Sequence, residues 1–431
     1  MKTKVGFVAC ALASAVLAQS AMAATEAEKR KAIDDGLAYL AGTQNANGSF
    51  DGGGLDYQLA QTGSALLAFL EERPNWGSNA AAYQTVVDKG LDFLFSNASV
   101  VGISAQPAGN PDGDGNGVGV KLYPGGINNR DTYVTGIALP AIASSGTPTK
   151  PVTVGPLAGR TDGTGPGGAW THRDVVQNVV DYYAYGQSDP ATGNNQGGWR
   201  YYANYGNSDQ STTQWPVIAS LYATKMGVST PGFVKSELSN WVSYIQNPTT
   251  GAAGYQSPFI PQGELNETGA LLIMQDYLNL PTSNSRVQAA LAYINANWTQ
   301  FANSTWDGNF NHPYAMWAIY KGLELSVGKS DTTAITNLLT DCGASRGATD
   351  PGDICNWWED YNEHLVTTQN GDGSWTGYSN WPSALATPWY VNILAGTVIP
   401  DDGGTVPAPA TIVLLAAGLL GLRRAQRRAK A

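Results

Sequence analysis

Hydrophobic residues along this chain gather into short apolar segments that lead into turns rich in Gln, Asn and Gly. The clearest turns read Gln-Asn-Ala-Asn-Gly-Ser-Phe at 44–50 and Gln-Asn-Gly-Asp-Gly-Ser-Trp at 369–375. Related copies lie at 180–199 and 241–255, where an apolar segment again precedes glycine and an aromatic residue. Recurrence of this kind indicates an internal repeat.

Each repeat also carries a second apolar segment that begins with a small or polar residue. These second segments are marked by Thr62, Thr135, Gln214, Thr268, Tyr314 and Thr387, and their partners begin near Ile33, Tyr83, Val175, Val234, Val287 and Trp357. A spacing of roughly fifty residues suits one helix pair per repeat.

A helix pair cannot bury its apolar face alone, so neighbouring pairs must stack. The second helices are apolar on all sides and therefore require enclosure. Six pairs closed into a ring, with the second helices inside, meet both requirements. The sequence predicts an all-α domain over residues 24–400, an α/α toroid of about six helix pairs, with an open solenoid as the alternative.

The two ends differ from this domain in composition. Residues 1–4 are basic, residues 5–18 are apolar, and small residues follow at 21–23, which is the pattern of a secretion signal over 1–23. At the other end, the apolar stretch 411–422 is followed by a basic cluster at 423–430. The apolar part is shorter than the ~20 residues that span a bilayer comfortably, although the arginines can snorkel.

The segment 401–431 resembles a PEP-CTERM sorting signal, because it joins Val406-Pro407-Ala408-Pro409-Ala410 to an apolar helix and an arginine cluster. Ala408 stands where that family usually has Glu. The resemblance implies a C-terminal membrane helix, transient anchoring in the inner membrane, processing by an exosortase, and delivery to the cell surface or extracellular matrix.

The repeat turns, together with 197–201 and 208–215, resemble the repeats of squalene/hopene cyclases and protein prenyltransferase β subunits. The resemblance implies the toroid fold, in which the Gln and aromatic residues join one helix to the next. Cyclases of that family protonate an alkene with an Asp-x-Asp-Asp acid, which is missing here. We therefore expect no cyclase activity.

Prenyltransferases of the same family bind zinc through an Asp-x-Cys pair and a distant His, and Asp353-Ile354-Cys355 has that form. His312 and His364 are the available third ligands, but the spacing differs from that of the family. Cys355 also has a simpler partner in Cys342, since two cysteines of an exported chain most simply form a disulfide. We expect the disulfide and no zinc.

The excess of acidic over basic residues limits which molecules the protein can bind. Seven of the 24 basic residues lie in the two ends, so 17 remain against 34 acidic residues. Such a surface repels nucleic acid. No catalytic cofactor is indicated, although Asp112, Asp114 and Asn116 match the first half of an EF-hand calcium loop. The twelfth position is Tyr123 instead of Glu, so a polar turn and a structural calcium site both stay open.

If the inner helices are in register, acidic and aromatic residues near their beginnings converge on one mouth of the ring. The predicted ligand-binding residues are Asp131, Tyr133, Asp209, Gln214, Trp215, Glu267, His312, Tyr314, Trp317 and Trp389. Ring faces stack on aromatic side chains while carboxylates bind hydroxyl groups or cations. Such a lining suits a glycan, a peptide or an isoprenoid, and no catalytic residue is assigned.

Three functional classes remain open on these observations. The favoured hypothesis is an exported, non-catalytic toroid at the cell envelope or matrix that binds a ligand. The alternatives are a cyclase- or prenyltransferase-like enzyme with altered chemistry, and a polysaccharide lyase or glycosidase built on a helical toroid, with Asp209 and Glu267 as paired carboxylates.

Overall fold

Twelve α-helices form two concentric rings in the computed structural model, which describes residues 23–50, 52–128, 130–340, 356–379 and 381–398. The outer helices are α1 (Glu26–Thr43), α3 (Ala80–Ser96), α5 (His172–Gly186), α7 (Gly232–Ile245), α9 (Ser285–Asn297) and α11 (Trp357–Thr368). The inner helices are α2 (Leu55–Glu71), α4 (Asp131–Ser144), α6 (Gln210–Ala223), α8 (Glu264–Tyr277), α10 (Pro313–Ser326) and α12 (Ser383–Leu394). Outer and inner helices alternate along the chain, as the repeat predicts.

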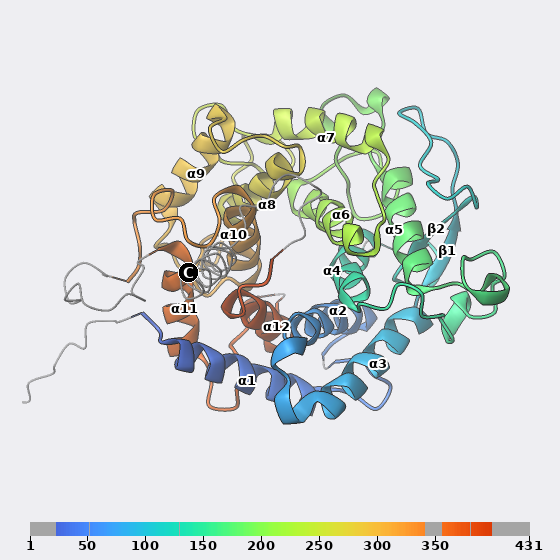
Figure 1. Ribbon diagram of the computed structural model, residues 1–431. Coiled ribbons are helices and arrows are strands. Elements are labelled where there is room, and N and C mark those ends of the chain that lie inside the picture. Colours follow the sequence, from blue (N-terminus) through green and yellow to red (C-terminus); the bar gives the residue numbers. More distant parts are fainter. Residues whose placement is uncertain (1–22, 51, 129, 341–355, 380, 399–431) are drawn as a thin grey trace, which may run out of the picture.

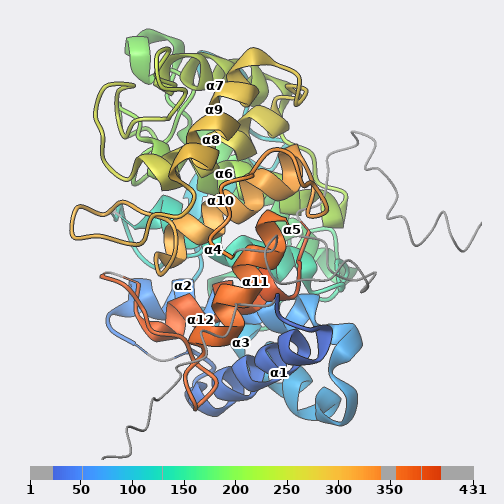
Figure 2. The same cartoon turned by 90° about the vertical axis from the view of Figure 1, so that its left-hand side faces the viewer.

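The inner helices close on themselves, which excludes the open solenoid. Each inner helix packs against the next around the ring, and α12 packs against α2. On the outside, α1 packs against α11 and α12, so the first and last helix pairs are neighbours (Figures 1 and 2). The predicted toroid of six helix pairs is confirmed.

Burial separates the two rings as their sequences predict. Every residue of α6 is buried, as befits a helix enclosed on all sides. In α7 the buried residues form a single stripe along the helix, and the other residues are more exposed. The buried residues are Val234, Leu238, Trp241, Val242 and Ile245. The outer ring is therefore amphipathic and the inner ring is core.

Glycines allow the inner helices to approach each other closely. A Cβ at Gly63 would lie 2.4 Å from the Cα of Ala138, and one at Gly269 would lie 2.5 Å from the backbone nitrogen of Ile319. These contacts join α2 to α4 and α8 to α10. A methyl group has no room at either position, since neighbouring backbone cannot move aside cheaply.

Glutamines at the ends of four outer helices, α1, α5, α7 and α11, join each of these helices to the next one around the ring. The side-chain amide of Gln44 donates to the carbonyl of Val86 over 2.8 Å, and Gln187 donates to Val234 over 3.0 Å. Gln246 makes the same bond to Arg286 over 2.8 Å. The glutamines of these turns therefore join one outer helix to the next, which is the role that the family resemblance implies.

Threonines in the first half of five inner helices hold the connecting segments. The hydroxyl of Thr62 accepts from the backbone nitrogen of Phe50 over 3.2 Å, and Thr387 accepts from that of Trp375 over 3.1 Å. Thr135, Thr213 and Thr268 accept equivalent bonds. Each repeat turn is thereby tied to the helix that follows it.

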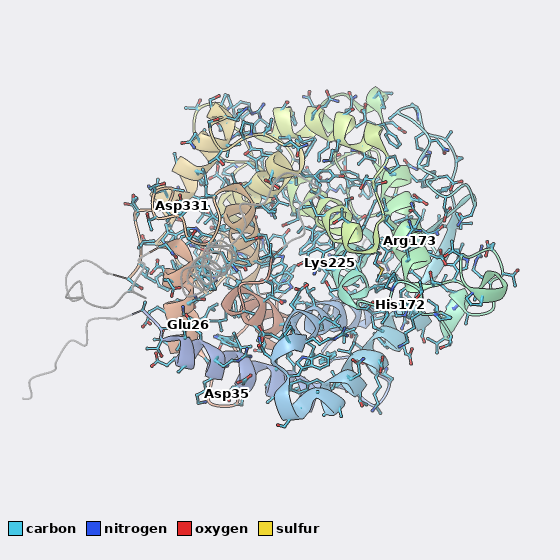
Figure 3. All side chains as sticks on the ribbon, viewed as in Figure 1. Glu26, Asp35, His172, Arg173, Lys225 and Asp331 are labelled. Atoms are coloured by element: carbon cyan, nitrogen blue, oxygen red, sulfur yellow. The ribbon has the colours of Figure 1, made fainter. Side chains whose placement is uncertain are left out.

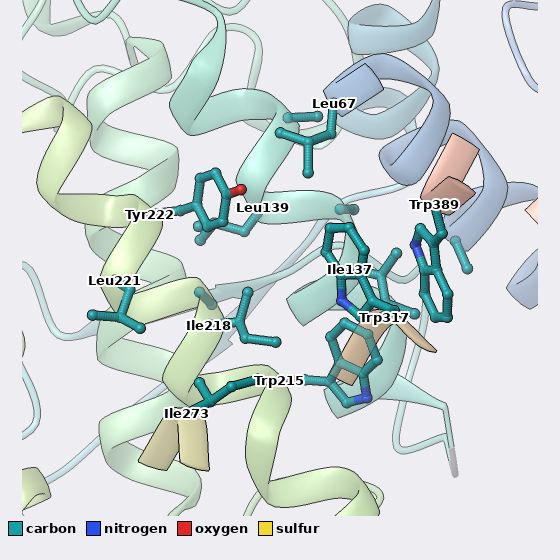
Figure 4. Packing of buried hydrophobic residues seen from close by; sticks show 14 of the residues in the cluster. Leu67, Ile137, Leu139, Trp215, Ile218, Leu221, Tyr222, Ile273, Trp317 and Trp389 are labelled. Carbon is teal, nitrogen blue, oxygen red and sulfur yellow. The ribbon is translucent and has the colours of Figure 1, made fainter. Parts of the chain in front are cut away.

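The centre of the ring is packed with side chains (Figure 4). The rings of Trp317 and Trp389 stack with centroids 5.5 Å apart, and Trp215 stacks on Trp389 at 5.8 Å. All three indoles are at most 3% exposed. Among the described residues, the middle of the toroid is therefore a closed core.

Glu26, Asp35 and Asp331 lie at the periphery of the toroid in Figure 3, whereas Lys225 lies near the middle of the view. Lys225 follows α6 and pairs with Glu71 at the end of α2, with 2.5 Å between the ammonium nitrogen and the carboxylate oxygen. A cation near the carboxyl ends of inner helices is favourable because it opposes their dipoles.

A two-stranded antiparallel sheet is inserted between α3 and α4, formed by β1 (Ser99–Gly102) and β2 (Val118–Lys121), and β2 packs against α5. Short 3₁₀ turns occupy other connections, at Arg73–Asn75, Gly77–Asn79, Gly155–Leu157, Pro166–Gly168, Pro190–Asn195 and Thr224–Met226.

Within the described ranges, no helix has the length and hydropathy needed to cross a membrane. The predicted secretion signal, the sorting tail with its membrane helix, and the cysteine pair Cys342 and Cys355 lie outside the described residues, and so do Asp353 and the rest of the Asp-x-Cys motif.

Candidate functional site

A pocket of about 210 Å³ opens where the inner helices begin. Its aromatic lining is Tyr57, Tyr133, Tyr255, Trp306, Tyr314 and Trp381. Its polar lining is Asp56, Arg130, Ser211, Gln262 and Glu267, and aliphatic contacts come from Ala60, Val134, Ile137 and Leu385. First turns of all six inner helices, or the residue just before them, contribute to this wall.

The two tryptophans of the lining come from loops and pack against each other, and Trp381 also packs against Tyr314. The rings of Trp381 and Tyr314 lie edge to face with centroids 4.9 Å apart, and those of Trp306 and Trp381 are 5.9 Å apart. Tyr378 stacks on Trp306 at 5.2 Å. Packed aromatic rings of this kind give a rigid apolar platform at the mouth of the pocket.

Glu267 is the most unusual polar residue of the pocket. Its side chain is buried, and its Oε2 atom has no hydrogen-bond partner in the described part of the chain. Burial raises the pKa of Glu267 well above its usual range, and the neighbouring charge of Asp209 raises it further. Burial therefore favours the protonated form of Glu267, which can donate a hydrogen bond.

Asp209 lies behind the wall and is held by a network of donors. Its carboxylate caps α6 by accepting from the backbone nitrogen of Thr212 over 2.7 Å, and it accepts from the hydroxyl of Ser211 over 2.9 Å. The guanidinium of Arg200 lies 3.5 Å away and Tyr255 donates over 3.3 Å. Burial raises the pKa of Asp209, while these donors act in the opposite direction.

The two carboxyl groups therefore differ in their surroundings. Asp209 has donors and a cation that favour its charged form, whereas Glu267 has neither and lies beside a negative charge. Groups whose environments differ in this way separate into one that keeps its proton and one that loses it. Of this pair, Glu267 is the residue whose surroundings favour the protonated form, and it lines the pocket.

The outer rim of the pocket is polar. Asp56 at the start of α2 pairs with Arg130 just before α4, with 3.4 Å between carboxylate and guanidinium. Both residues also line a shallower depression shared with Tyr123, Ile127, Asn128 and Tyr201. Charged and amide groups at the rim can bind hydroxyl groups of a ligand that rests on the aromatic platform.

No model of a known protein family matches this chain, and no curated protein matches it in sequence. Its structure is similar to that of a family 76 glycoside hydrolase from a bovine Bacteroides thetaiotaomicron strain, with a TM-score of 0.52 and 11% identity over 86% of this chain and 77% of the hydrolase. The type II terpene cyclase MstE from Scytonema, without ligand, gives a TM-score of 0.45 at 11% identity, covering 86% and 98% of the two chains.

The chain has an α/α-toroid fold. At 11% identity the likeness to the hydrolase establishes this architecture and no activity. Any chemistry of this toroid therefore depends on its own residues.

The toroid brings together only part of the predicted site. Tyr133, Glu267 and Tyr314 line the pocket. Asp209 and Gln214 lie behind them, where the amide of Gln214 bonds the hydroxyl of Tyr314. Trp215, Trp317 and Trp389 lie in the closed core beneath, so they can act on a ligand only by supporting the lining residues.

Two predicted residues lie away from the lining. Asp131 forms a buried ion pair with Lys121, with 2.8 Å between the charged atoms, which fastens β2 to the start of α4. His312 caps α10 by accepting from the backbone nitrogen of Ala315 over 3.3 Å. Burial lowers the pKa of His312 to about 4, so its ring is neutral at physiological pH.

Several lining residues were not predicted, namely Asp56, Tyr57, Arg130, Tyr255, Gln262, Trp306 and Trp381. Asp56, Tyr57 and Arg130 lie at the beginnings of inner helices, so the rule that selected Tyr133 could also have found them. Trp306, Trp381 and Gln262 lie in the loops that precede inner helices, and no periodicity signals their direction.

The predicted calcium loop lies in the connection between β1 and β2, apart from the pocket lining. Asp112 and Asp114 meet Asp181 of α5 there, and the three can each direct an oxygen to a common point. Burial, together with the nearby charge of Asp114, raises the pKa of Asp181 to about 7. Among the described residues, this is the one His, Cys, Asp or Glu group with metal-ligand geometry.

Proposed function

We propose that this protein is an exported toroid that binds a glycan segment in the pocket where its inner helices begin. The observation that carries the proposal is the lining itself, in which Trp306, Trp381 and Tyr314 lie next to Asp56, Arg130 and Glu267. Aromatic faces stack on sugar rings, and the polar groups between them bind sugar hydroxyls.

A glycan fits this arrangement better than an isoprenoid does. A prenyl chain needs a long apolar tunnel, and the middle of the ring is occupied by the stacked indoles of Trp215, Trp317 and Trp389. A sugar needs only a shallow platform with hydroxyl partners nearby. The carboxyl of Glu267 suits it as well, because its Oε2 atom has no hydrogen-bond partner among the described residues and its protonated form can both donate to and accept from a hydroxyl group.

The proposal is tested by screening the folded protein against defined oligosaccharides and measuring the affinity of those retained. We expect Trp306→Ala to weaken binding about tenfold, since one stacked ring is worth on the order of 1 kcal/mol. Tyr244→Ala is the control, because Tyr244 is a partly buried aromatic residue of the outer helix α7. Retention of a prenyl alcohol with no oligosaccharide bound would contradict the proposal.

A second candidate function is acid catalysis, which the state of Glu267 favours. A neutral carboxylic acid facing a ligand can protonate the bridging oxygen of a glycosidic bond as the carbon–oxygen bond breaks. Water then supplies the hydroxyl group to the sugar carbon and a proton to Glu267. Asp56 is the other carboxylate of the lining and could orient that water.

Glu267→Gln separates the two candidates because glutamine keeps hydrogen-bonding groups but cannot transfer a proton. For a binding protein we expect near-normal affinity and no release of reducing sugar from either form. For a hydrolase we expect reducing sugar from the natural protein only. The natural protein turning over a prenyl diphosphate or squalene would instead support the cyclase-like alternative.

Export and anchoring are proposed from the two ends of the chain. The secretion signal over 1–23 would direct the toroid out of the cytoplasm, and the tail over 401–431 would anchor it until an exosortase acts. Deleting 401–431 should release a folded toroid to the medium. Unchanged retention at the envelope would contradict an anchoring tail.

The proposed Cys342–Cys355 disulfide predicts no free thiol in the exported form.

A further inference from the structure

Three carboxylates from distant parts of the chain meet beside the inserted hairpin. Asp112 and Asp114 belong to the loop between β1 and β2, and Asp181 belongs to the outer helix α5. One oxygen of each lies within 4.8 Å of the others. None of the three forms a salt bridge with a Lys or Arg of the described residues, so no cationic side chain there offsets their mutual repulsion.

Asp181 supplies an independent sign of a ligand. Its side chain is 0% exposed, and its Oδ2 atom has no hydrogen-bond partner among the described residues. Its other oxygen, Oδ1, accepts from the backbone nitrogen of Gly113 over 3.1 Å and from the amide of Gln177 over 3.0 Å. A buried carboxylate oxygen without a donor is costly, and it therefore calls for a positive partner.

The loop itself has the backbone of a calcium loop. Asp112 accepts from the backbone nitrogens of Gly115 over 2.8 Å and Gly117 over 2.9 Å, which curls the chain around its carboxylate. Gly117 has a φ of +75° and stands at the sixth position of the motif, where an EF-hand loop requires glycine for its sharp turn.

We propose that Asp112, Asp114 and Asp181 bind one Ca²⁺ ion. The EF-hand motif ends in a carboxylate from its own helix, and here Tyr123 occupies that place. Asp181 supplies the missing carboxylate from α5 instead. Donors that are all oxygen select a hard cation, and a site of loop and helix oxygens suits the flexible coordination of Ca²⁺ better than the strict octahedron of Mg²⁺.

The ion would fasten the hairpin to the toroid. The loop already contacts α5 through Gly113 and through Asn116, whose amide donates to Asn178 over 2.9 Å. Calcium would add ligand bonds between the same two elements. Its absence would leave the β1–β2 loop held by these weaker contacts and the buried Oδ2 atom of Asp181 without a partner among the described residues.

The test is thermal unfolding of the full exported chain after removal of metal with EDTA. We expect about 10 mM CaCl₂ to raise the Tm by about 2 °C or more, with saturation at one ion per chain by calorimetry. Binding should be in the about 10⁻⁴–10⁻³ M range of extracellular calcium modules. An equal increase with MgCl₂ would reflect charge screening and would overturn the proposal.

Two variants and a control locate the site. Asp181→Asn and Asp114→Asn should each remove the calcium-dependent increase, and Asp114 lies on the exposed loop, so its replacement leaves the fold intact. Asp372→Asn alters a similar Gly-Asp-Gly turn far along the chain, where Asp372 bonds Ser374, and should keep the full increase. A calcium response that survives both site variants would overturn the proposal.

Discussion

The side-chain amide of Gln369 donates a hydrogen bond to the backbone carbonyl of Ala32 over 2.8 Å, across 337 residues of sequence. Gln369 ends the last outer helix, α11, and Ala32 lies in the first, α1. The same amide also donates to the carbonyl of Gly373 over 3.0 Å, which closes the repeat turn. One side chain thus joins the two ends of the repeat array.

We expect Gln369→Ala to lower the free energy of unfolding by about 1–3 kcal/mol, because both carbonyls lose their donor in a partly buried position. Urea unfolding measures the change. Gln300→Ala is the matched control, since the side-chain amide of that glutamine bonds the side chain of Asn297 at an exposed site. A loss no greater than that of the control would mean that the bond between α11 and α1 adds nothing to stability.

Replacing glycine by alanine should change the free energy of unfolding in opposite directions at two positions of the toroid. At Gly269 the new methyl group would lie 2.5 Å from a backbone nitrogen, so we expect a loss of about 3 kcal/mol or more. At Gly42, in the outer helix α1, no atom lies within 4 Å of the new methyl group. There alanine should stabilise the protein by about 0.5–1 kcal/mol by favouring the helix. Similar values at both sites would refute the close approach of α8 and α10.

His172 should make stability depend on pH. Burial lowers the pKa of His172 to about 4 in the folded protein, and the nearby ammonium of Lys150 acts in the same direction. The unfolded chain, with a histidine pKa near its ordinary value of about 6.5, takes up a proton first as the pH falls. The contribution is therefore fully present above about pH 6.5 and is lost as the pH falls towards 4.

Comparison with His172→Gln isolates this effect from other groups. Between about pH 6.5 and 4, the natural protein should lose stability relative to the variant by about 1.4 kcal/mol per pH unit. Above that range the difference should be constant. A flat difference across the whole range would show that His172 is accessible to protons in the folded state.

Tryptophans at two depths should separate stability from binding. Trp215 is 1% exposed in the core, so Trp215→Ala should cost about 3–5 kcal/mol of unfolding free energy. Trp306 is only partly buried and lines the pocket, so Trp306→Ala should affect oligosaccharide binding far more than stability. Thermal unfolding measures the stability of both variants, and calorimetric titration measures their affinity for the oligosaccharide. Equal losses of stability would contradict the placement of Trp306 at the mouth.

Local repetition made the fold predictable. In each Gln-Asn turn the glutamine amide bonds a backbone carbonyl of the next outer helix. The motif can be read in the sequence, so it predicts a contact between two helices that are distant along the chain. Gln44 and Gln369 carry the motif at opposite ends of the chain, and both have the predicted role. The closure of the ring was also predictable, since the second helices are apolar on all sides.

The pocket was only partly predictable, because several side chains of the first turns line it whereas the large indoles deeper in the inner helices support it from below. Tyr133 and Glu267 fall within the first four residues of α4 and α8 and line the pocket. Trp215 and Trp389 lie in the second turns of α6 and α12 and pack below. Trp381 lies in a loop whose path depends on the packing of its neighbours.

The contact of α1 with α11 and α12 leaves this array without terminal repeats. In an open array the end units unfold first, because each has a single neighbour. Here every helix pair has two, so loss of any pair exposes two faces at once and unfolding should be all-or-none. For the same reason the chain could be circularly permuted, with its old ends joined and a new opening placed in the exposed connection 229–231 between α6 and α7.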